Sequence, residues 1–208
     1  MVQPMTPKIK VIALDMGGVF NGWSFHNLKK ILSNHLHVSE ELVFESWQGN
    51  ILPYLRHEIE EHEFWNRFRI SAKVSASDEM LRNLTLPINT RRPWMEKLVS
   101  HLKKTYIIAS VTDHSNWIYD LESRHPFTRL FDHVINSWEE GHLKPDLRLF
   151  QKLADLTNSK FSEIIFVDDR SDFGPPLTKE GINFIHYRNK PRFLADLSSF
   201  GVNLPNNL

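Results

Sequence analysis

The stretch IKVIALDMGGV, residues 9–19, runs from a segment rich in Ile and Val into Asp15, Met16 and a pair of glycines. A short apolar run of this kind predicts a buried strand of a parallel sheet. The carboxylate and glycines after it predict a turn at the carboxyl end of that strand. Further runs of the same apolar character predict more strands, at 106–109, 133–136, 164–167 and 182–185.

Helical patterns alternate with these runs from residue 106 onward, at 117–124, 147–156 and 177–180. Such β–α alternation predicts a parallel sheet with helices packed on both of its faces. The expected fold class is therefore α/β, with a Rossmann-like three-layer core.

One long interval interrupts this alternation. More than 90 residues separate the first two predicted strands, whereas a whole strand–helix–strand unit takes about 30. Apolar residues at helical spacing, such as Phe64, Trp65 and Phe68, recur through 21–89. We therefore expect a core of 8–20 and 90–208 with a helical domain, 21–89, inserted after the first strand. The aromatic residues of the insertion are expected to form its own core.

Composition excludes several classes of protein. The 208 residues carry 25 basic and 25 acidic side chains, which argues against a nucleic-acid or polybasic membrane-surface protein. With no cysteine, a thiolate nucleophile and a cysteine-based metal centre are excluded. No apolar run approaches the roughly 20 residues of a membrane span, and the polar start does not resemble a signal peptide. We expect a cytoplasmic protein without nucleic-acid or membrane partners.

Polar residues follow several of the predicted strands. Asp15 follows the first, Ser110 to Asp113 follow the second, and Asp168 with Asp169 follow the fourth, while Lys144 precedes a proline before the fourth. Ligands of open parallel sheets bind beyond the carboxyl ends of the strands. These side chains are therefore expected to meet at one edge of the sheet.

The residue types in this group indicate a particular chemistry. Neighbouring carboxylates repel one another unless a cation joins them, and carboxylate oxygens suit Mg²⁺. A lysine, a hydroxyl and glycine amides beside that ion form a phosphate site, where an aspartate can act as nucleophile. Taken singly, each fragment has a structural alternative, because strand-end aspartates often cap helices and glycine pairs often form turns.

In their order along the chain, these motifs resemble the haloacid dehalogenase-like (HAD) hydrolase superfamily, whose members are mostly Mg²⁺-dependent phosphatases. The insertion is placed like the helical cap that follows the first motif in one subfamily. The opening DMGGV, residues 15–19, is most similar to the glucose-1-phosphatase-like and epoxide hydrolase amino-terminal branch.

The resemblance implies roles for individual residues. Asp15 would be the nucleophile, Ser110 would hold the phosphoryl group, and Lys144 would be the third-motif lysine. Metal ligands would come from Asp15, the Gly17 carbonyl, Asp168 and Asp169. Substrate contacts would come from Gly17, Gly18, Ser110, Val111 and Lys144.

The sequence also departs from the superfamily. Gly17 stands where most phosphatases have a second aspartate, the general acid and base. Val111 and Phe173 replace a frequent asparagine and a frequent acidic residue, with Asp172 one position earlier. His26 and His114 are candidates to supply a proton instead. A positioned acid is worth roughly 10²- to 10⁴-fold in rate, so its loss need not abolish catalysis.

The expected function is hydrolysis of a small phosphomonoester with Mg²⁺, through an aspartyl-phosphate, by a monomer or homodimer. A catalytically impaired binding or regulatory protein with the same fold is the main alternative. A 2-haloacid dehalogenase, in which the same aspartate attacks carbon, is a further alternative.

Overall fold

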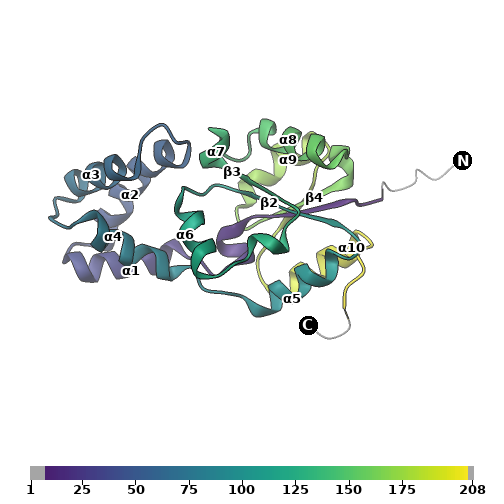
Figure 1. Ribbon diagram of the computed structural model, residues 1–208, viewed down its shortest axis with the longest axis horizontal. Coiled ribbons are helices and arrows are strands. Elements are labelled where there is room, and N and C mark those ends of the chain that lie inside the picture. Colours follow the sequence, from purple (N-terminus) through teal and green to yellow (C-terminus); the bar gives the residue numbers. More distant parts are fainter. Residues whose placement is uncertain (1–7, 206–208) are drawn as a thin grey trace, which may run out of the picture.

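A computed structural model describes residues 8–205 and contains a five-stranded sheet. All pairings are parallel, in the order β3-β2-β1-β4-β5, so the strand that precedes Asp15 is central (Figure 1). The strands are β1 Val11–Leu14, β2 Ile107–Thr112, β3 His133–Asn136, β4 Ile164–Asp168 and β5 Asn183–His186. The predicted α/β fold with a parallel sheet is confirmed.

Helices cover both faces of the sheet. Alternate residues of β1 face opposite sides, because side chains of a strand alternate. Ile12 and Leu14 belong to the core that includes α5 (Pro93–Leu102), α6 (Trp117–Arg124) and α10 (Lys190–Ser199). Val11 and Ala13 pack with α8 (Leu147–Thr157) and α9 (Gly174–Lys179). In Figure 1, α8 and α9 therefore lie on one side of the strands, with α5 and α10 on the other.

After the turn Met16–Phe20, four helices and a short 3₁₀ turn lie between β1 and α5 in the chain. They are α1 Phe25–Leu36, α2 Glu40–Leu55, α3 Glu61–Ala72, α4 Asp78–Thr85 and the turn Leu86–Ile88. Helices α1 to α4 gather at one end of the molecule (Figure 1). The Ser39 and Ser77 side chains cap α2 and α4 by accepting backbone N–H bonds of 3.1 Å.

A second apolar cluster holds these helices together. The aromatic residues expected to form it are buried, namely Trp47, Phe64, Trp65 and Phe68. The cluster also includes Trp117 of α6 and Trp138 of α7 (Ser137–Glu140). Tyr54 of α2 donates a 2.5 Å hydrogen bond to Asn116, just before α6. The insertion is therefore packed against the loops that follow β2 and β3.

The second strand is longer than predicted. It continues through Val111 to Thr112, where the sequence pattern suggested an end at Ala109. Two of the three added residues, Val111 and Thr112, are β-branched, and such residues favour a pleated strand. Ser110 consequently lies inside the sheet, paired with Leu14 of β1 and Val134 of β3.

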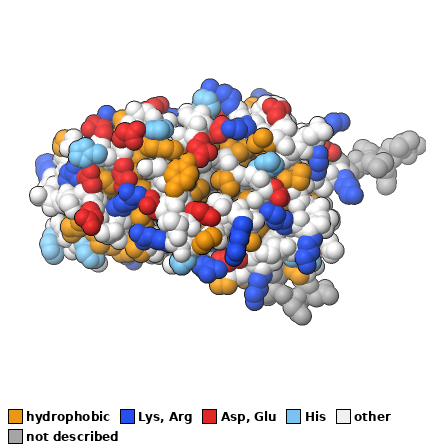
Figure 2. All heavy atoms as spheres, viewed as in Figure 1, with side chains coloured by type: hydrophobic (Ala, Val, Ile, Leu, Met, Phe, Trp, Pro, Cys, Tyr) orange, Lys and Arg blue, Asp and Glu red, His pale blue; other side chains and the backbone are white. Residues whose placement is uncertain are grey.

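Charged side chains of both signs are interspersed over the helical end of the molecule on the face that Figure 2 shows. Within residues 8–205, no helix combines the length and the apolar character needed to cross a membrane.

Candidate active site

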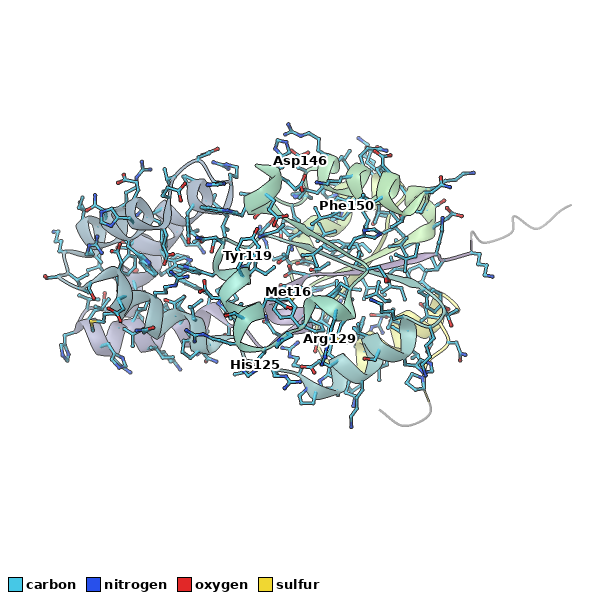
Figure 3. All side chains as sticks on the ribbon, in the orientation of Figure 1. Met16, Tyr119, His125, Arg129, Asp146 and Phe150 are labelled. Atoms are coloured by element: carbon cyan, nitrogen blue, oxygen red, sulfur yellow. The ribbon has the colours of Figure 1, made fainter. Side chains whose placement is uncertain are left out.

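The turn after β1 brings Asp15 and Asp169 together. The Asp15 amide donates to the Val167 carbonyl at 2.9 Å, and Asp15 is only 8% exposed. Met16, the next residue, is buried in the core of one sheet face (Figure 3). Gly18 has φ +75°, and a Cβ placed on it would lie 2.2 Å from Asp169 Oδ2. Glycine is therefore required at position 18 for the Asp169 carboxylate to approach the turn.

Gly18→Ala is expected to destabilise the fold by roughly 1–3 kcal/mol, because a left-handed backbone costs a residue with a Cβ about 1–2 kcal/mol and the methyl group displaces Asp169. Chemical denaturation measures the change. Gly49→Ala is the matched control, since its added Cβ meets nothing within 4 Å beyond its chain neighbours and its own helix backbone, and alanine favours its helical position. A Gly18→Ala protein with the same free energy of unfolding as wild type would contradict the close approach of Asp169 to the turn.

Lys144 joins two of the carboxylates. Its Nζ lies 2.7 Å from Asp15 Oδ1 and 2.6 Å from Asp168 Oδ2, and its side chain is 3% exposed. Burial alone would lower the pKa of Lys144, but the charges of Asp15, Asp113 and Asp168 outweigh it and hold that pKa above its ordinary value. Lys144 is therefore a buried cation at neutral pH.

The residues around Lys144 orient it. Its backbone N–H donates to Asp113 Oδ1 at 3.0 Å. Asp146, two residues later, instead caps α8 by accepting the Arg148 N–H at 3.0 Å. Figure 3 shows Asp146 at the beginning of α8, well away from Met16. Within the run Lys144-Pro145-Asp146, the lysine therefore lies among the carboxylates of the site, and the aspartate caps α8.

Asp168 and Asp169 differ in their surroundings. Asp168 is completely buried; its Oδ2 accepts from Lys144 and its Oδ1 accepts the Arg170 N–H at 2.8 Å. Burial raises the pKa of Asp168 to about 7, although Lys144 opposes the shift. Asp169 is more open, and burial followed by the Asp15 charge raises its pKa. Among residues 8–205, no ion pair engages the Asp169 carboxylate.

Carboxylate oxygens of Asp15, Asp168 and Asp169 lie within 4.8 Å of one another. Three such groups repel one another, and among residues 8–205 the one cation buried between them is Lys144. Their oxygens form a donor set suited to a hard divalent cation such as Mg²⁺. The expected meeting of residues 15, 144, 168 and 169 at the sheet edge is present.

A cavity of about 300 Å³ opens onto this cluster. Asp15, Gly17, Lys144, Asp168 and Asp169 all border it. On the other side it is bordered by residues of the insertion and of α6, and these are mostly aromatic or aliphatic.

The structure places Ser110 and Val111, two of the predicted substrate contacts, away from the cavity. Neither borders the cavity: Ser110 is fully buried inside β2, and Val111 packs in the core beneath α8. Thr112 and Asp113 border the cavity instead. The β-branched residues Val111 and Thr112 are the signal in the sequence that could have extended the predicted strand to residue 112.

The candidate proton donors differ in whether they border the cavity. His26 is exposed on α1 and does not border the cavity, whereas His114 does. The Asp172 carboxylate is 62% exposed and paired with Arg170 at 2.6 Å, outside the cavity. Phe173 borders the cavity and is buried. Asp172 therefore does not replace the acidic group absent at position 173.

His114 is held in one tautomer. Its Nδ1 lies 3.1 Å from the Ser115 carbonyl, which can only accept a hydrogen bond. Burial lowers the pKa of His114, so the ring is neutral at pH 7. With the proton on Nδ1, the Nε2 atom is a hydrogen-bond acceptor.

Solved structures similar to this chain share its fold. A protein described as a predicted HAD-like family hydrolase, from Porphyromonas gingivalis, has a TM-score of 0.79 at 16% identity, over 94% of this chain and 98% of that one. A HAD family enzyme from Bacteroides thetaiotaomicron, in complex with magnesium and inorganic phosphate, has a TM-score of 0.71 at 19% identity, over 86% and 94%. L-2-haloacid dehalogenase from Xanthobacter autotrophicus has a TM-score of 0.63 at 14% identity, over 92% and 83%.

Sequence comparison gives a shorter match. Bifunctional epoxide hydrolase 2 of Mus musculus is 26% identical over 113 residues, which are 51% of this chain and 20% of that protein. The Rattus norvegicus protein matches to the same extent. The match thus spans one-fifth of the length of these relatives. No protein-family model matches the chain. The chain has the fold of HAD family enzymes.

Proposed function

We propose that this HAD-fold chain is a Mg²⁺-dependent phosphatase that hydrolyses a small phosphomonoester through an aspartyl-phosphate on Asp15. One observation carries the proposal: buried Lys144 contacts Asp15 at 2.7 Å, beside the carboxylate of Asp169, at the end of a cavity. A nucleophile, a buried cation and oxygen ligands are what phosphoryl transfer to a carboxylate requires.

Each residue has a definite part in the proposed reaction. A carboxylate oxygen of Asp15 forms a bond to phosphorus, and the bond from phosphorus to the leaving oxygen breaks. Water then hydrolyses the acyl phosphate, which returns the Asp15 carboxylate and releases inorganic phosphate. Lys144, held between Asp15 and Asp168, would pair with a phosphoryl oxygen throughout, and Asp168 would hold the lysine in position.

The donor set fits a magnesium ion. Asp15, Asp169 and the Gly17 carbonyl would hold it, because Asp168 is already bonded to Lys144 and to the Arg170 N–H. When bound, the ion would neutralise phosphoryl charge and orient the phosphate against Asp15. We also propose that residues 21–89 act as a cap, since several of them border the cavity from the side opposite Asp15. A cap of this kind excludes water and selects the substrate.

Thr112 takes the hydroxyl role in this proposal, because it borders the cavity and Ser110 does not. We expect Thr112→Val, which removes only the hydroxyl donor, to lower kcat/KM by roughly 10- to 100-fold. Ser110→Ala should leave kcat/KM within about twofold of wild type, since its hydroxyl has no hydrogen-bond partner inside the sheet. Steady-state kinetics on both variants checks the assignment. A larger loss of kcat/KM for Ser110→Ala than for Thr112→Val would return the hydroxyl role to Ser110.

The direct test of the function is phosphate release from phosphomonoesters with and without Mg²⁺, by a folded protein. Release that requires Mg²⁺ supports the proposal. The same preparation should be offered a 2-haloacid, because dehalogenases also have this fold. Halide release without metal would identify a dehalogenase instead.

A further inference from the structure

The two ends of the cavity differ in chemistry. Every charged residue that borders it ends or follows a strand of the sheet or precedes α8: Asp15, Asp113, Lys144, Asp168, Asp169 and Arg170. The opposite end is apolar, made by Phe25, Trp47, Ile51, Leu52 and Leu55, and Trp23 joins it from beside Gly17. Trp117 extends this apolar wall, whereas Phe173 lies at the charged end, with Lys144 Nζ 5.6 Å from the centroid of its ring. No bordering residue from 21–89 carries a charge.

The polar groups of the apolar end are few. Gln48 and Asn89 are its two polar side chains. Asn89 is already engaged, because its Oδ1 accepts from Asn21 at 3.2 Å and its amide donates to the Leu86 carbonyl at 3.3 Å. That leaves the Gln48 amide, the second N–H of the Asn89 amide and the indole N–H groups of Trp23, Trp47 and Trp117; among the described residues, Trp117 Nε1 is buried without a hydrogen-bond partner. These groups are mostly donors, so the hydroxyl hydrogens of a sugar or the charged amine of an amino acid would find few acceptors there.

The energetic consequence is direct. A buried polar atom without a hydrogen-bond partner is destabilising, whereas the burial of apolar surface is favourable. Aromatic rings are stabilised further when they pack against other aromatic rings. The cavity therefore favours an aromatic hydrocarbon group over a polyol or a charged group.

The residues nearest the reacting end favour the same kind of leaving group. Gly17 has no side chain to give a proton, and the Trp23 ring lies 3.5 Å from where its Cβ would be. The Nδ1 of His114 lies 3.1 Å from the Ser115 carbonyl, which leaves no proton on Nε2 of the neutral ring. Neither of these two residues supplies a proton in this arrangement. A phenolate leaves without a proton far more readily than a sugar alkoxide does.

We propose that the substrate is an aryl phosphate, the phosphomonoester of an uncharged phenol with one or two rings. This inference rests on the proposed phosphatase function. The cavity volume of about 300 Å³ is at the lower end of the range for small-ligand sites. The phosphoryl group would meet Asp15 and Lys144, and the rings would lie against Trp23, Trp47 and Trp117.

A matched set of substrates tests the proposal. We would measure kcat/KM with Mg²⁺ for 2-naphthyl phosphate, phenyl phosphate, phosphotyrosine and glucose 6-phosphate. Phenyl phosphate and phosphotyrosine release phenols of similar acidity, so their comparison isolates the charged amino-acid group. Phenyl phosphate is expected to exceed phosphotyrosine by about tenfold or more. We expect 2-naphthyl phosphate to be the best substrate and glucose 6-phosphate the poorest.

One variant places a charge in the apolar wall. Leu52 borders the cavity and is 45% exposed, so Leu52→Lys should fold. It is expected to lower kcat/KM for 2-naphthyl phosphate about tenfold, through KM. Inhibition by inorganic phosphate should stay unchanged, because phosphate binds at the other end. Leu156→Lys, at a 50% exposed position of α8 outside the cavity, should behave as wild type.

A binding measurement separates this inference from the function on which it rests. Asp15→Asn protein can be titrated with 2-naphthyl phosphate and with glucose 6-phosphate, followed by tryptophan fluorescence. Turnover in which glucose 6-phosphate or phosphotyrosine equals phenyl phosphate would overturn the aryl assignment and leave the phosphatase standing. Selective naphthyl binding without turnover of any ester would retain the aryl site and reject the phosphatase. If the protein shows no binding preference and no turnover, both proposals are rejected.

Discussion

Asp15→Asn is expected to lower phosphate release at least about 10⁴-fold. An amide oxygen is a poor nucleophile toward phosphorus, so the covalent step is lost while the shape of the side chain is kept. The fold should survive, because the substitution removes one of three mutually repelling carboxylates. Initial rates with saturating Mg²⁺ on the best aryl phosphate measure the loss, and circular dichroism checks the fold.

Asp172→Asn is the matched control for that result. Asp172 is two-thirds exposed and outside the cavity, so its variant should keep kcat/KM within about twofold of wild type. An Asp15→Asn protein that retained a tenth of wild-type activity would show that another group attacks phosphorus. Wild-type protein that is folded yet turns over no phosphomonoester would favour the binding-protein alternative.

Much of this site could be predicted because its residues adjoin strands that the pattern locates well. Asp15 and the pair Asp168–Asp169 directly follow apolar runs whose ends are marked by a change to polar residues. Parallel topology then brings the strand ends together. Lys144 was recognised from its neighbouring proline and aspartate, although the burial that makes it a link between two carboxylates could not be seen in the sequence.

The second strand shows where pattern alone fails. Its polar end begins with Ser110, but the serine is followed by two β-branched residues that continue the strand. A serine inside a buried strand is uncommon, so the pattern placed the strand end before it. In the register of the sheet, Ser110 pairs with Leu14, one residue before Asp15. The residue that borders the cavity is therefore Thr112, two positions later.

The apolar lining of the cavity could not be predicted from the sequence, for a different reason. Ile51 and Leu52 occur in the same helix as Trp47, one of the aromatic residues that were expected to form the core of the insertion. Periodicity identifies an apolar face but not what that face meets, because a cavity wall and a packed core use the same residues. Trp47 serves both purposes: it is 5% exposed within the helical cluster and also borders the cavity.

Lys144→Met should affect stability and activity together. Removing the buried cation leaves Asp15 and Asp168 without their partner, and loss of one member of a buried ion pair costs about 3–5 kcal/mol. Phosphate release should fall by about 10³-fold, because the proposed contact with the phosphoryl oxygen is lost as well. Denaturant unfolding and initial rates measure the two effects. Lys152→Met is the control, since that lysine pairs with Glu140 at 47% exposure on the surface of α8.

The pH dependence of Lys144→Met gives the sharper test. In the folded wild type, burial raises the pKa of Asp168 to about 7, against about 3.9 for an exposed aspartate. A group with a raised folded pKa contributes stability that is complete below the unfolded pKa and is lost as pH rises through the folded value. The contribution of Asp168 to the free energy of unfolding should therefore decline between about pH 4 and pH 7 in wild type.

Without Lys144 the pKa of Asp168 rises further, because the cation that favoured its ionised form is gone. The destabilisation caused by Lys144→Met should therefore be smallest near pH 4 and should grow as the pH rises past 7. Denaturation curves of both proteins at several pH values, without Mg²⁺, give the difference. A destabilisation independent of pH would mean that the lysine contributes through packing of its aliphatic stem and not through its charge. The link among Asp15, Lys144 and Asp168 would then lose its electrostatic basis.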